Sequence, residues 1–348
     1  MSHPFVTEKI TNNNMSRGLI STAFILVTAL VLVSAYIRLS NVGLGCQDWP
    51  ACYGRIGSAE QGQMSRTERT SSYENLLIGS QEPLAWATPA HRLIASILGL
   101  LIFAINIQAF IYRKQGVSLI IPVILLGLTV FLALLGISSG GLHKPSIVLG
   151  NLLGGFAMLA FLWKLRLTTN NQGQPLSALQ TNPQHQWIKR GAKLGIALLI
   201  AQVILGGLTS ANFAALACTS FPDCNGTWWP TSEVQKALDI FRVMDTDEAG
   251  VFIGGGEQIA IHITHRLGAW LLLFYLGGLA YIVIKMNRIY RMTGIIILVL
   301  LTTEILIGTL NVLTHMQLLS TVAHNGVAAF LLLSLISLHH KINTSPAG

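Results

Sequence analysis

The chain has 348 residues, of which 10% are charged and 52% are hydrophobic. Because an ordinary soluble domain carries roughly a quarter charged residues, this composition excludes a typical soluble globular protein. The formal net charge of +8 comes from Lys and Arg spread over alternate segments between apolar stretches. That distribution indicates membrane orientation and argues against nucleic-acid binding.

Eight apolar stretches are close to the roughly 20 residues that a transmembrane helix needs. Their interiors are nearly free of charge and they are too long for barrel strands, so helices are expected. The first run is too long for the apolar part of a signal peptide, and we expect it to be retained. The predicted spans are Gly18–Ile37, Ala87–Tyr112, Val117–Ile137, Pro145–Trp163, Leu194–Ala214, Ile259–Ile284, Met292–Leu313 and Leu318–Leu338.

The charges of the connecting segments predict which side each one faces. With the N-terminus inside, the inside segments contain 13 of the 22 Lys and Arg, and the outside loops contain 12 of the 14 acidic residues. Positive charge collects on the cytoplasmic side of membrane proteins, so both termini are expected in the cytoplasm. All four cysteines then lie outside, where disulfides persist.

The two long outside loops repeat one pattern. Cys46 to Cys52 and Cys218 to Cys224 both read Cys-x-x-aromatic-Pro-x-Cys-x-Gly. A His-Arg pair follows 39 residues after the first loop's second cysteine and 41 residues after the other's, and each pair opens an apolar run. Such self-similarity at a fixed spacing is the mark of an internal repeat.

The repeat predicts an all-α integral membrane protein whose eight transmembrane helices form two pseudo-symmetric four-helix bundles. The expected N-terminal repeat is 1–166, with its outer cysteine loop at 38–86. A polar cytoplasmic linker at 167–189 is rich in Asn, Gln and Thr. The expected C-terminal repeat is 190–348, with its outer cysteine loop at 210–258.

Three interpretations of each cysteine pair remain open. A zinc site needs four ligands, and neither loop has a histidine at zinc-finger spacing. A redox-active pair needs an exposed thiol of low pKa. A local disulfide, Cys46–Cys52 or Cys218–Cys224, is the interpretation that we favour, because a small outside loop gains from a covalent staple.

Two histidines in the second half are predicted to lie at one depth in the membrane. His265 and His324 each come about six residues into a span, and the two spans run in the same direction. At 1.5 Å per residue both lie roughly 9 Å below the span starts. Two imidazoles at one depth are typical of bis-histidine haem ligation in a helix bundle. His262, one turn earlier, shares the helix face of His265 and is a further cofactor-binding candidate.

The matching positions of the first half carry different chemistry. His91 lies 60 residues before Asn151, whereas His265 lies 59 residues before His324. Asn is a poor iron ligand, so the matched positions offer one imidazole, that of His91. Arg92 follows His91 as Arg266 follows His265, and both guanidiniums are candidates for pairing with haem propionates or for the headgroup region.

Other polar residues inside the spans follow the same repeat. Gln202-x3-Gly206-x2-Thr209 in the fifth span is similar to Glu304-x3-Gly308-x2-Asn311 in the seventh. Glu304 is the one acid well inside a predicted span, and it is a candidate for proton relay or for helix pairing. The small residues after each histidine, Leu267-Gly268-Ala269 and Gly326-Val327-Ala328-Ala329, are expected to leave room for a flat macrocycle.

Taken together, the cysteine loops, Trp228-Trp229-Pro230, His262-x-x-His265-Arg266 and Ala323-His324-Asn325 resemble the haem A synthase family. The resemblance covers Gly18 to Leu338. It implies an inner-membrane (cytoplasmic membrane) enzyme of two four-helix bundles that oxidises the C8 methyl of haem O to a formyl group. It also implies an electron donor, and haem O synthase or oxidase assembly factors as partners.

The resemblance assigns roles residue by residue. His265 and His324 are the expected ligands of a resident haem b, and the role at the substrate haem O carries over to His91 and to Cys46 and Cys52 above it. Arg92 and Asn151 are the further catalytic candidates at that site. The family pattern Glu-x-x-His-Arg on the second span is Thr88-Pro89-Ala90-His91-Arg92 here, and Asn151 stands where the family has its fourth histidine.

Two other functions remain as alternatives from the residues. One is a non-catalytic membrane haem b protein, either an electron carrier or a haem chaperone, with no working oxidation site. The other is a thiol oxidoreductase of the membrane exterior, which depends on the cysteines alone. Haem analysis separates the first alternative from a haem A synthase.

Overall fold

The computed structural model describes residues 4–41, 86–115, 117–138, 144–170, 183–242, 254–286 and 288–344. These residues form helices and connecting turns, and within them the one β-bridge joins Cys224 to Thr227. A short 3-10 turn covers Arg113–Gln115. The helices are α1 (Pro4–Asn41), α3 (Ala87–Ile111), α4 (Ile120–Ser138), α5 (Pro145–Asn170), α6 (Pro183–Ala211), α7 (Val234–Leu238), α8 (Gly256–Met286), α9 (Arg288–Leu313) and α10 (Leu318–Thr344).

Eight of the described helices, all except α7, are long and apolar enough to cross a membrane. Large apolar side chains point outward from them, and Leu100, Phe274 and Leu319 are each more than 70% exposed. In water such surface would favour aggregation, whereas lipid tails are as apolar as leucine. The predicted all-α fold with eight transmembrane helices is confirmed.

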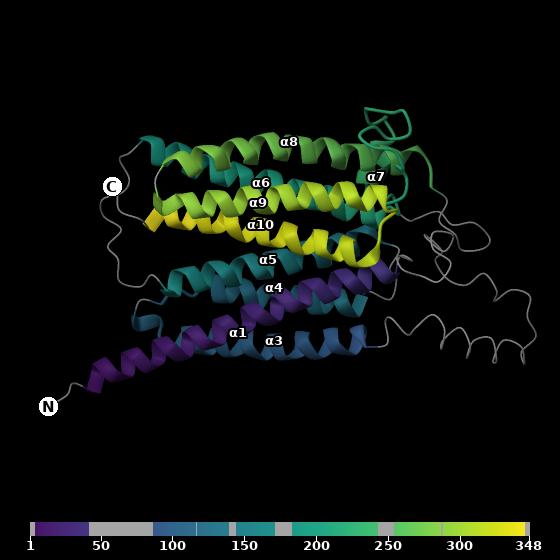
Figure 1. Ribbon diagram of the computed structural model, residues 1–348. Coiled ribbons are helices and arrows are strands. Elements are labelled where there is room, and N and C mark those ends of the chain that lie inside the picture. The colour runs from purple at the N-terminus through teal and green to yellow at the C-terminus, as the bar shows by residue number, and fades with distance from the viewer. Residues whose placement is uncertain are drawn as a thin grey trace, which may run out of the picture.

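The long helices run side by side (Figure 1), and their contacts group them into two rings of four. In one ring α1 packs on α3 and α5, and α4 closes the ring. In the other, α6 packs on α8 and α10, and α9 closes the ring. The rings meet where α1 contacts α10 and α5 contacts both α6 and α10. The packing partners therefore correspond, helix by helix, between the two halves.

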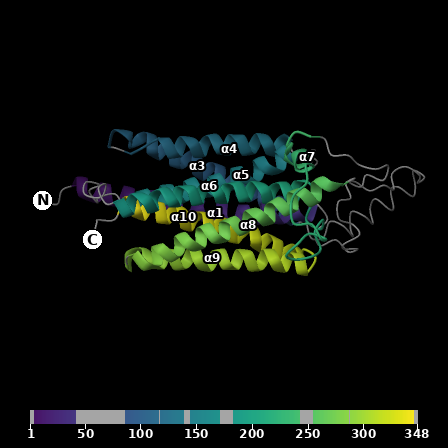
Figure 2. The same cartoon turned by 90° about the horizontal axis from the view of Figure 1, so that it is seen from above.

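The first residues of α1 and the last residues of α10 lie at the same end of the helices (Figure 2). The short helix α7 and the turns around it lie at the opposite end. An even number of crossings has this consequence, because each crossing reverses the direction of the chain. The cysteine loop of the second half is therefore on the side away from both ends of the chain.

Most helix boundaries differ from the predicted spans, and α1 for example begins at Pro4 rather than Gly18. Two differences concern the fifth span and the predicted linker. The fifth span was expected to reach Ala214, but α6 ends at Ala211. Asn212 turns its amide back to the Leu208 carbonyl at 2.8 Å, and Phe213 adopts a left-handed φ of 51° that cannot continue a helix. In addition, α5 and α6 both extend into the predicted linker 167–189, from 167 to 170 and from 183 to 189.

Ion pairs and hydrogen bonds hold the α7 region on the ends of the helices. Glu257, at the start of α8, lies 3.4 Å from both Lys236 and Arg242 and is buried. The Ile240 carbonyl accepts a hydrogen bond of 2.9 Å from the backbone N–H of Ser146, at the start of α5. This outer segment of the second half thus rests on both rings.

Candidate functional site

The cysteine loop of the second half is closed by a disulfide between Cys218 and Cys224. Both cysteines are buried and pack against Ile263 of α8. Of the three interpretations, the structure confirms the local disulfide for this pair. The predicted Cys46–Cys52 disulfide lies outside the described residues.

Arg266 fastens this loop to α8. Its guanidinium donates to the backbone carbonyls of Ser220 at 2.8 Å, of Cys218 at 3.2 Å and of Asp223. Its Nε is buried without a hydrogen-bond partner among the described residues. The side chain also borders the cavity described below, so its assignment to a haem propionate stays a prediction, while its contact with the loop is direct.

The loop is further ordered by Asp223. Its carboxylate accepts a 2.5 Å hydrogen bond from the backbone N–H of Gly226, and this bond is the main cause that lowers the pKa of Asp223 below its usual value. Gly226 has a φ of 85°, a conformation that glycine adopts readily and that other residues rarely adopt. The loop therefore forms a fixed cover above the helix ends.

Beneath this cover lies a cavity, which the loop residues Ala215 and Phe221 help to line. Its walls come from six helices, α1, α5, α6, α8, α9 and α10, and most wall residues are apolar. The polar side chains that line it are Arg38, Gln202, Thr209, Ser210, His262, His265, Arg266, Glu304, Thr309, Asn311, Thr321, His324 and Asn325.

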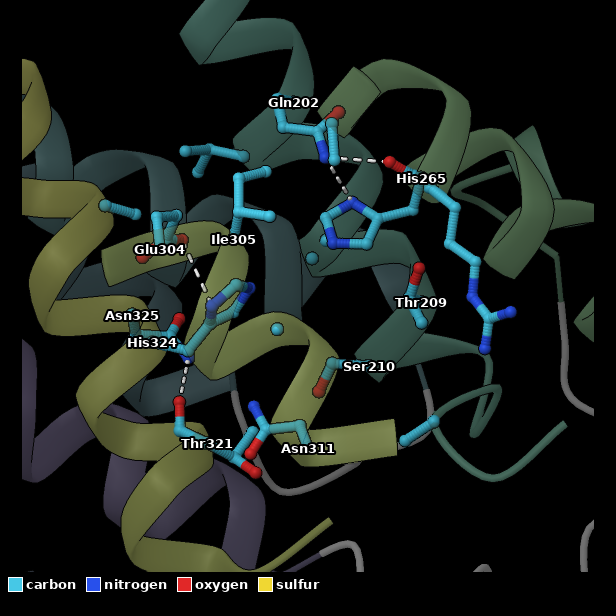
Figure 3. Close-up of a pocket in the computed structure, with 18 of the residues that line it drawn as sticks. Gln202, Thr209, Ser210, His265, Glu304, Ile305, Asn311, Thr321, His324 and Asn325 are labelled. Carbon is cyan, nitrogen blue, oxygen red and sulfur yellow. Dashed lines mark hydrogen bonds and ion pairs between the residues drawn. The ribbon is translucent and has the colours of Figure 1, made fainter. Parts of the chain in front are cut away.

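His265 of α8 and His324 of α10 face one another across this cavity (Figure 3). Their ring centres are 6.5 Å apart, with the ring planes at 84°. Two imidazoles that bind opposite sides of one metal at about 2.0–2.1 Å per bond have ring centres roughly 6.3 Å apart. The observed separation therefore matches a metal held between the two rings, and the sequence correctly placed the two residues together.

A polar neighbour touches Nδ1 of each ring. The amide nitrogen of Gln202 lies 3.0 Å from Nδ1 of His265 and donates to the His265 carbonyl at 2.8 Å. On the other side, Oε1 of Glu304 lies 3.2 Å from Nδ1 of His324, as a close contact rather than a well-directed hydrogen bond. In both histidines the polar neighbour thus lies beside Nδ1, and Nε2 is the nitrogen left for the cavity.

Two glycines make room for the two rings. A Cβ on Gly206 would lie 3.1 Å from Cε1 of His265, and a Cβ on Gly308 would lie 3.2 Å from Cε1 of His324. The two predicted stretches of small residues reach the cavity through Ala269 and Ala328, whereas their glycines lie against other side chains. A Cβ on Gly268 would overlap Oε1 of Gln202, and one on Gly326 would meet Leu32 of α1.

His262 lies one turn before His265 and is buried. Its Nδ1 donates to the Ala214 carbonyl at 2.8 Å, which ties α8 to the segment after α6. The same side chain borders the cavity. A proton held on Nδ1 leaves Nε2 as an acceptor, so His262 fits a positioning role better than that of a donor to an anionic group.

Several lining residues were not singled out by the sequence analysis, and Arg38 is the charged one among them. Arg38, at the end of α1, reaches from the first ring into this cavity and donates to Oδ1 of Asn325 at 2.8 Å. Asn325 directly follows His324. The only sequence signal was an arginine at the outer end of an apolar span, which is equally typical of a headgroup contact.

The predicted catalytic residues of the first half are placed on two helices. His91 and Arg92 lie in the first turns of α3, where His91 is half-buried and Arg92 is exposed, and Asn151 is half-buried on α5. Within the described part of the chain, no hydrogen bond or ion pair joins these three side chains. The structure therefore brings together the second-half pair and not the first-half set.

The helix facing Asn151 also lacks the support that serves His324. Glu304 and Gly308 lie 20 and 16 residues before His324, and the residues at the same distances before Asn151 are Phe131 and Leu135. Both side chains face α5, because a Cβ on Gly150 would lie 2.7 Å from Leu135 and 3.7 Å from Phe131. In the first half, Asn, Phe and Leu thus stand where the second half has the histidine ligand, the acid beside it and the glycine beneath it.

The residues around the cavity fit a haem. Among the described residues, no cluster of three or more His, Cys, Asp or Glu side chains is placed to hold a metal ion. A haem brings its own four nitrogens and needs only axial ligands from the protein. The two facing imidazoles, the two clearing glycines and the apolar walls supply that need.

Comparison with known proteins adds the family. Residues 17–336 match the family described as cytochrome oxidase assembly protein. A heme A synthase of Shewanella oneidensis is 31% identical over 92% of this chain and 95% of that protein. Heme A synthases of Neorickettsia sennetsu and Nitrosospira multiformis are 22% and 23% identical, over 92% and 91% of this chain and 96% and 90% of those proteins. The chain therefore belongs to the family of cytochrome oxidase assembly proteins.

Proposed function

We propose that this protein is a haem A synthase, which oxidises the C8 methyl of haem O to a formyl group for terminal oxidase assembly. Its relatives in the family bear the name heme A synthase and align over nearly their whole length. The observation in this chain that carries the proposal is the pair of imidazoles facing one another across an apolar cavity within the membrane-spanning helices.

The second half is proposed to hold a resident haem b, which His265 and His324 would bind. When bound there, the haem would supply one-electron transfer. The protein's part is to aim both Nε2 atoms, to exclude water with apolar walls, and to close the outer end with the disulfide loop. Arg38 and Arg266 border the same cavity and are the candidates for contacts to the propionates.

The first half is proposed to bind haem O, with His91 as the single imidazole ligand, Arg92 as a propionate contact, and Asn151 facing the iron from α5. Phe131 and Leu135 support this arrangement, since they leave α4 without a polar partner for a second ligand. With one protein ligand, a bound haem would supply oxygen chemistry at its iron. In balanced form, the methyl group, two O₂, four electrons from an external donor and four protons would give the formyl group and three water molecules.

The two rings of helices are proposed to correspond to repeats 1–166 and 190–348. The proposed location is the inner (cytoplasmic) membrane with both termini in the cytoplasm. Two observations support that orientation: both ends of the described helices lie together, and the disulfide loop lies at the other end, where an oxidising compartment keeps it closed. Haem O synthase or oxidase assembly factors are the proposed protein partners.

The test is haem analysis of membranes from a strain that lacks its own haem A synthase and makes haem O. Expression of this chain should produce haem A. His91→Ala should abolish haem A but leave the low-spin haem b spectrum, whereas His265→Ala and His324→Ala should abolish that spectrum. Asn151→His should tighten binding of haem O and slow its conversion, because it fills the free position.

The opposite result is equally clear. Haem O and haem b without haem A, in the presence of oxygen and a donor, would mean that the chain is a non-catalytic haem protein. A normal low-spin spectrum in His265→Ala would overturn the assignment of the axial pair.

A further inference from the structure

We infer that Gln202 and Glu304 are a matched pair of positioning residues, each of which holds one axial imidazole through Nδ1 and sets how strongly that imidazole donates to the iron. The inference rests on the proposed haem site. It assigns to both residues the same function. Because one is an amide and the other a carboxylate, they should differ in how strongly each raises the basicity of its imidazole.

The first line of argument is that the two residues occupy one position in the repeat. Each is followed four residues later by a glycine that faces the same histidine: Gly206 under His265, and Gly308 under His324. The two helices therefore present the same unit, a polar group behind Nδ1 and a gap beneath Cε1. Two occurrences of one unit around one cavity are better explained by a common task than by chance packing.

Geometry excludes both residues as ligands themselves. Gln202 and Glu304 lie behind the rings, on the sides turned away from the facing histidine (Figure 3). A histidine that binds iron through Nε2 carries its proton on Nδ1, and a ligating histidine almost always donates that proton to a neighbour. Oε1 of Glu304 is already 3.2 Å from Nδ1 of His324. The amide nitrogen of Gln202 lies against both Nδ1 and the carbonyl of His265, so iron binding through Nε2 requires the Gln202 side chain to shift and bring its amide oxygen, which is buried without a hydrogen-bond partner, to Nδ1.

Gly268 supports the role of Gln202 independently. A Cβ at this position would overlap the amide oxygen of Gln202, so the glycine is what lets this amide lie behind His265. Gly268 is not one of the residues that line the cavity. Its small size therefore serves the positioning residue rather than the ligand in the cavity.

The difference between the two residues has a direction. A carboxylate behind a ligating imidazole raises its basicity more than an amide does, because it attracts the Nδ1 proton more strongly. A more basic ligand stabilises ferric over ferrous haem, and hydrogen bonding around the ligands is one of the ways in which proteins set haem potentials. Glu304 should therefore keep the potential of this haem lower than an amide in its place would.

An exchange experiment on the haem-loaded, full-length protein tests this. Glu304→Gln should shift the ferric–ferrous equilibrium roughly tenfold towards ferrous haem, which is ~59 mV upwards for a one-electron couple. Gln202→Glu should shift it downwards. The double exchange keeps one amide and one carboxylate, so its potential should return close to that of the unchanged protein. A purely structural role predicts the reverse, with the double exchange the most damaged.

Gly268→Ala provides a second route if Gln202→Glu gives no folded haem protein. It displaces the Gln202 amide from a position that does not itself line the cavity, and it should lower haem retention about tenfold. Gly278→Ala on the same helix, which meets no neighbour, should not. A potential unchanged in Glu304→Gln, or a double exchange displaced further than either single one, would overturn the inference alone. Absence of a His265-dependent low-spin haem in the unchanged protein would instead overturn the proposed function.

Discussion

The glycines beneath the two histidines allow a prediction whose size follows from the structure. A Cβ on Gly308 would lie 3.2 Å from Cε1 of His324 and one on Gly206 would lie 3.1 Å from Cε1 of His265, whereas ordinary contacts begin at 3.4 Å. Alanine at either position must therefore displace the ring by a few tenths of an ångström. Metal–ligand distances are held to within about 0.2 Å, so the displacement is comparable to the tolerance of an iron–imidazole bond.

We expect Gly206→Ala and Gly308→Ala to lower haem affinity by roughly 10- to 100-fold, the range typical of disturbed support around a metal ligand. The assay is haem content per purified protein, together with the low-spin absorption spectrum. Gly278→Ala is the matched control, because its Cβ meets nothing within 4 Å. An exposed helical Gly→Ala change should stabilise the helix by about 0.5–1 kcal/mol. Full haem occupancy in both site variants, with an unchanged spectrum, would refute the reasoning.

Two further predictions concern the disulfide loop. Arg266→Gln removes charged donors from three backbone carbonyls, so added protease should cleave the loop at least several-fold faster. The control variant Arg92→Gln on α3 should leave the cleavage rate unchanged. Equal cleavage rates in the two variants would contradict the role of Arg266. Asp223 has a lowered pKa in the folded loop, so its stabilising contribution is fully present above its unfolded pKa of about 3.9 and is lost as pH falls through the lower folded value. Hydrogen exchange at Gly226 should therefore accelerate, relative to its intrinsic rate, on acidification in the native protein but not in Asp223→Asn.

Many features of this protein could be predicted from short segments of its sequence. Eight apolar runs of bilayer length predict eight spans because an isolated helix satisfies its own backbone hydrogen bonds in lipid. The spacing between Cys218 and Cys224 predicted a local disulfide for the same kind of reason, since a short loop keeps its ends close. The equal depths of His265 and His324 followed from counting residues along helices of fixed rise.

The supporting residues behave differently. The sequence showed that Gln202 and Glu304 recur in the same pattern, but not that each lies behind one histidine. The contact of Arg38 could not be predicted from the sequence, because its partner Asn325 is 287 residues away on a helix of the other half. The end of α6 was misplaced by three residues, since an apolar Phe213 gives no sign that its backbone turns to a positive φ.

The sequence by itself thus predicted the number and order of the membrane-spanning helices, the Cys218–Cys224 disulfide and the meeting of His265 with His324, all of which depend on the period and length of single segments. Only the tertiary structure decided which face of each helix meets which neighbour. It alone showed that Arg266 binds the loop backbone, that Gly268 makes room for Gln202, and that Phe131 and Leu135 face α5 beside Asn151. Those contacts depend on the rotation and tilt of whole helices against one another, which packing of many side chains fixes at once.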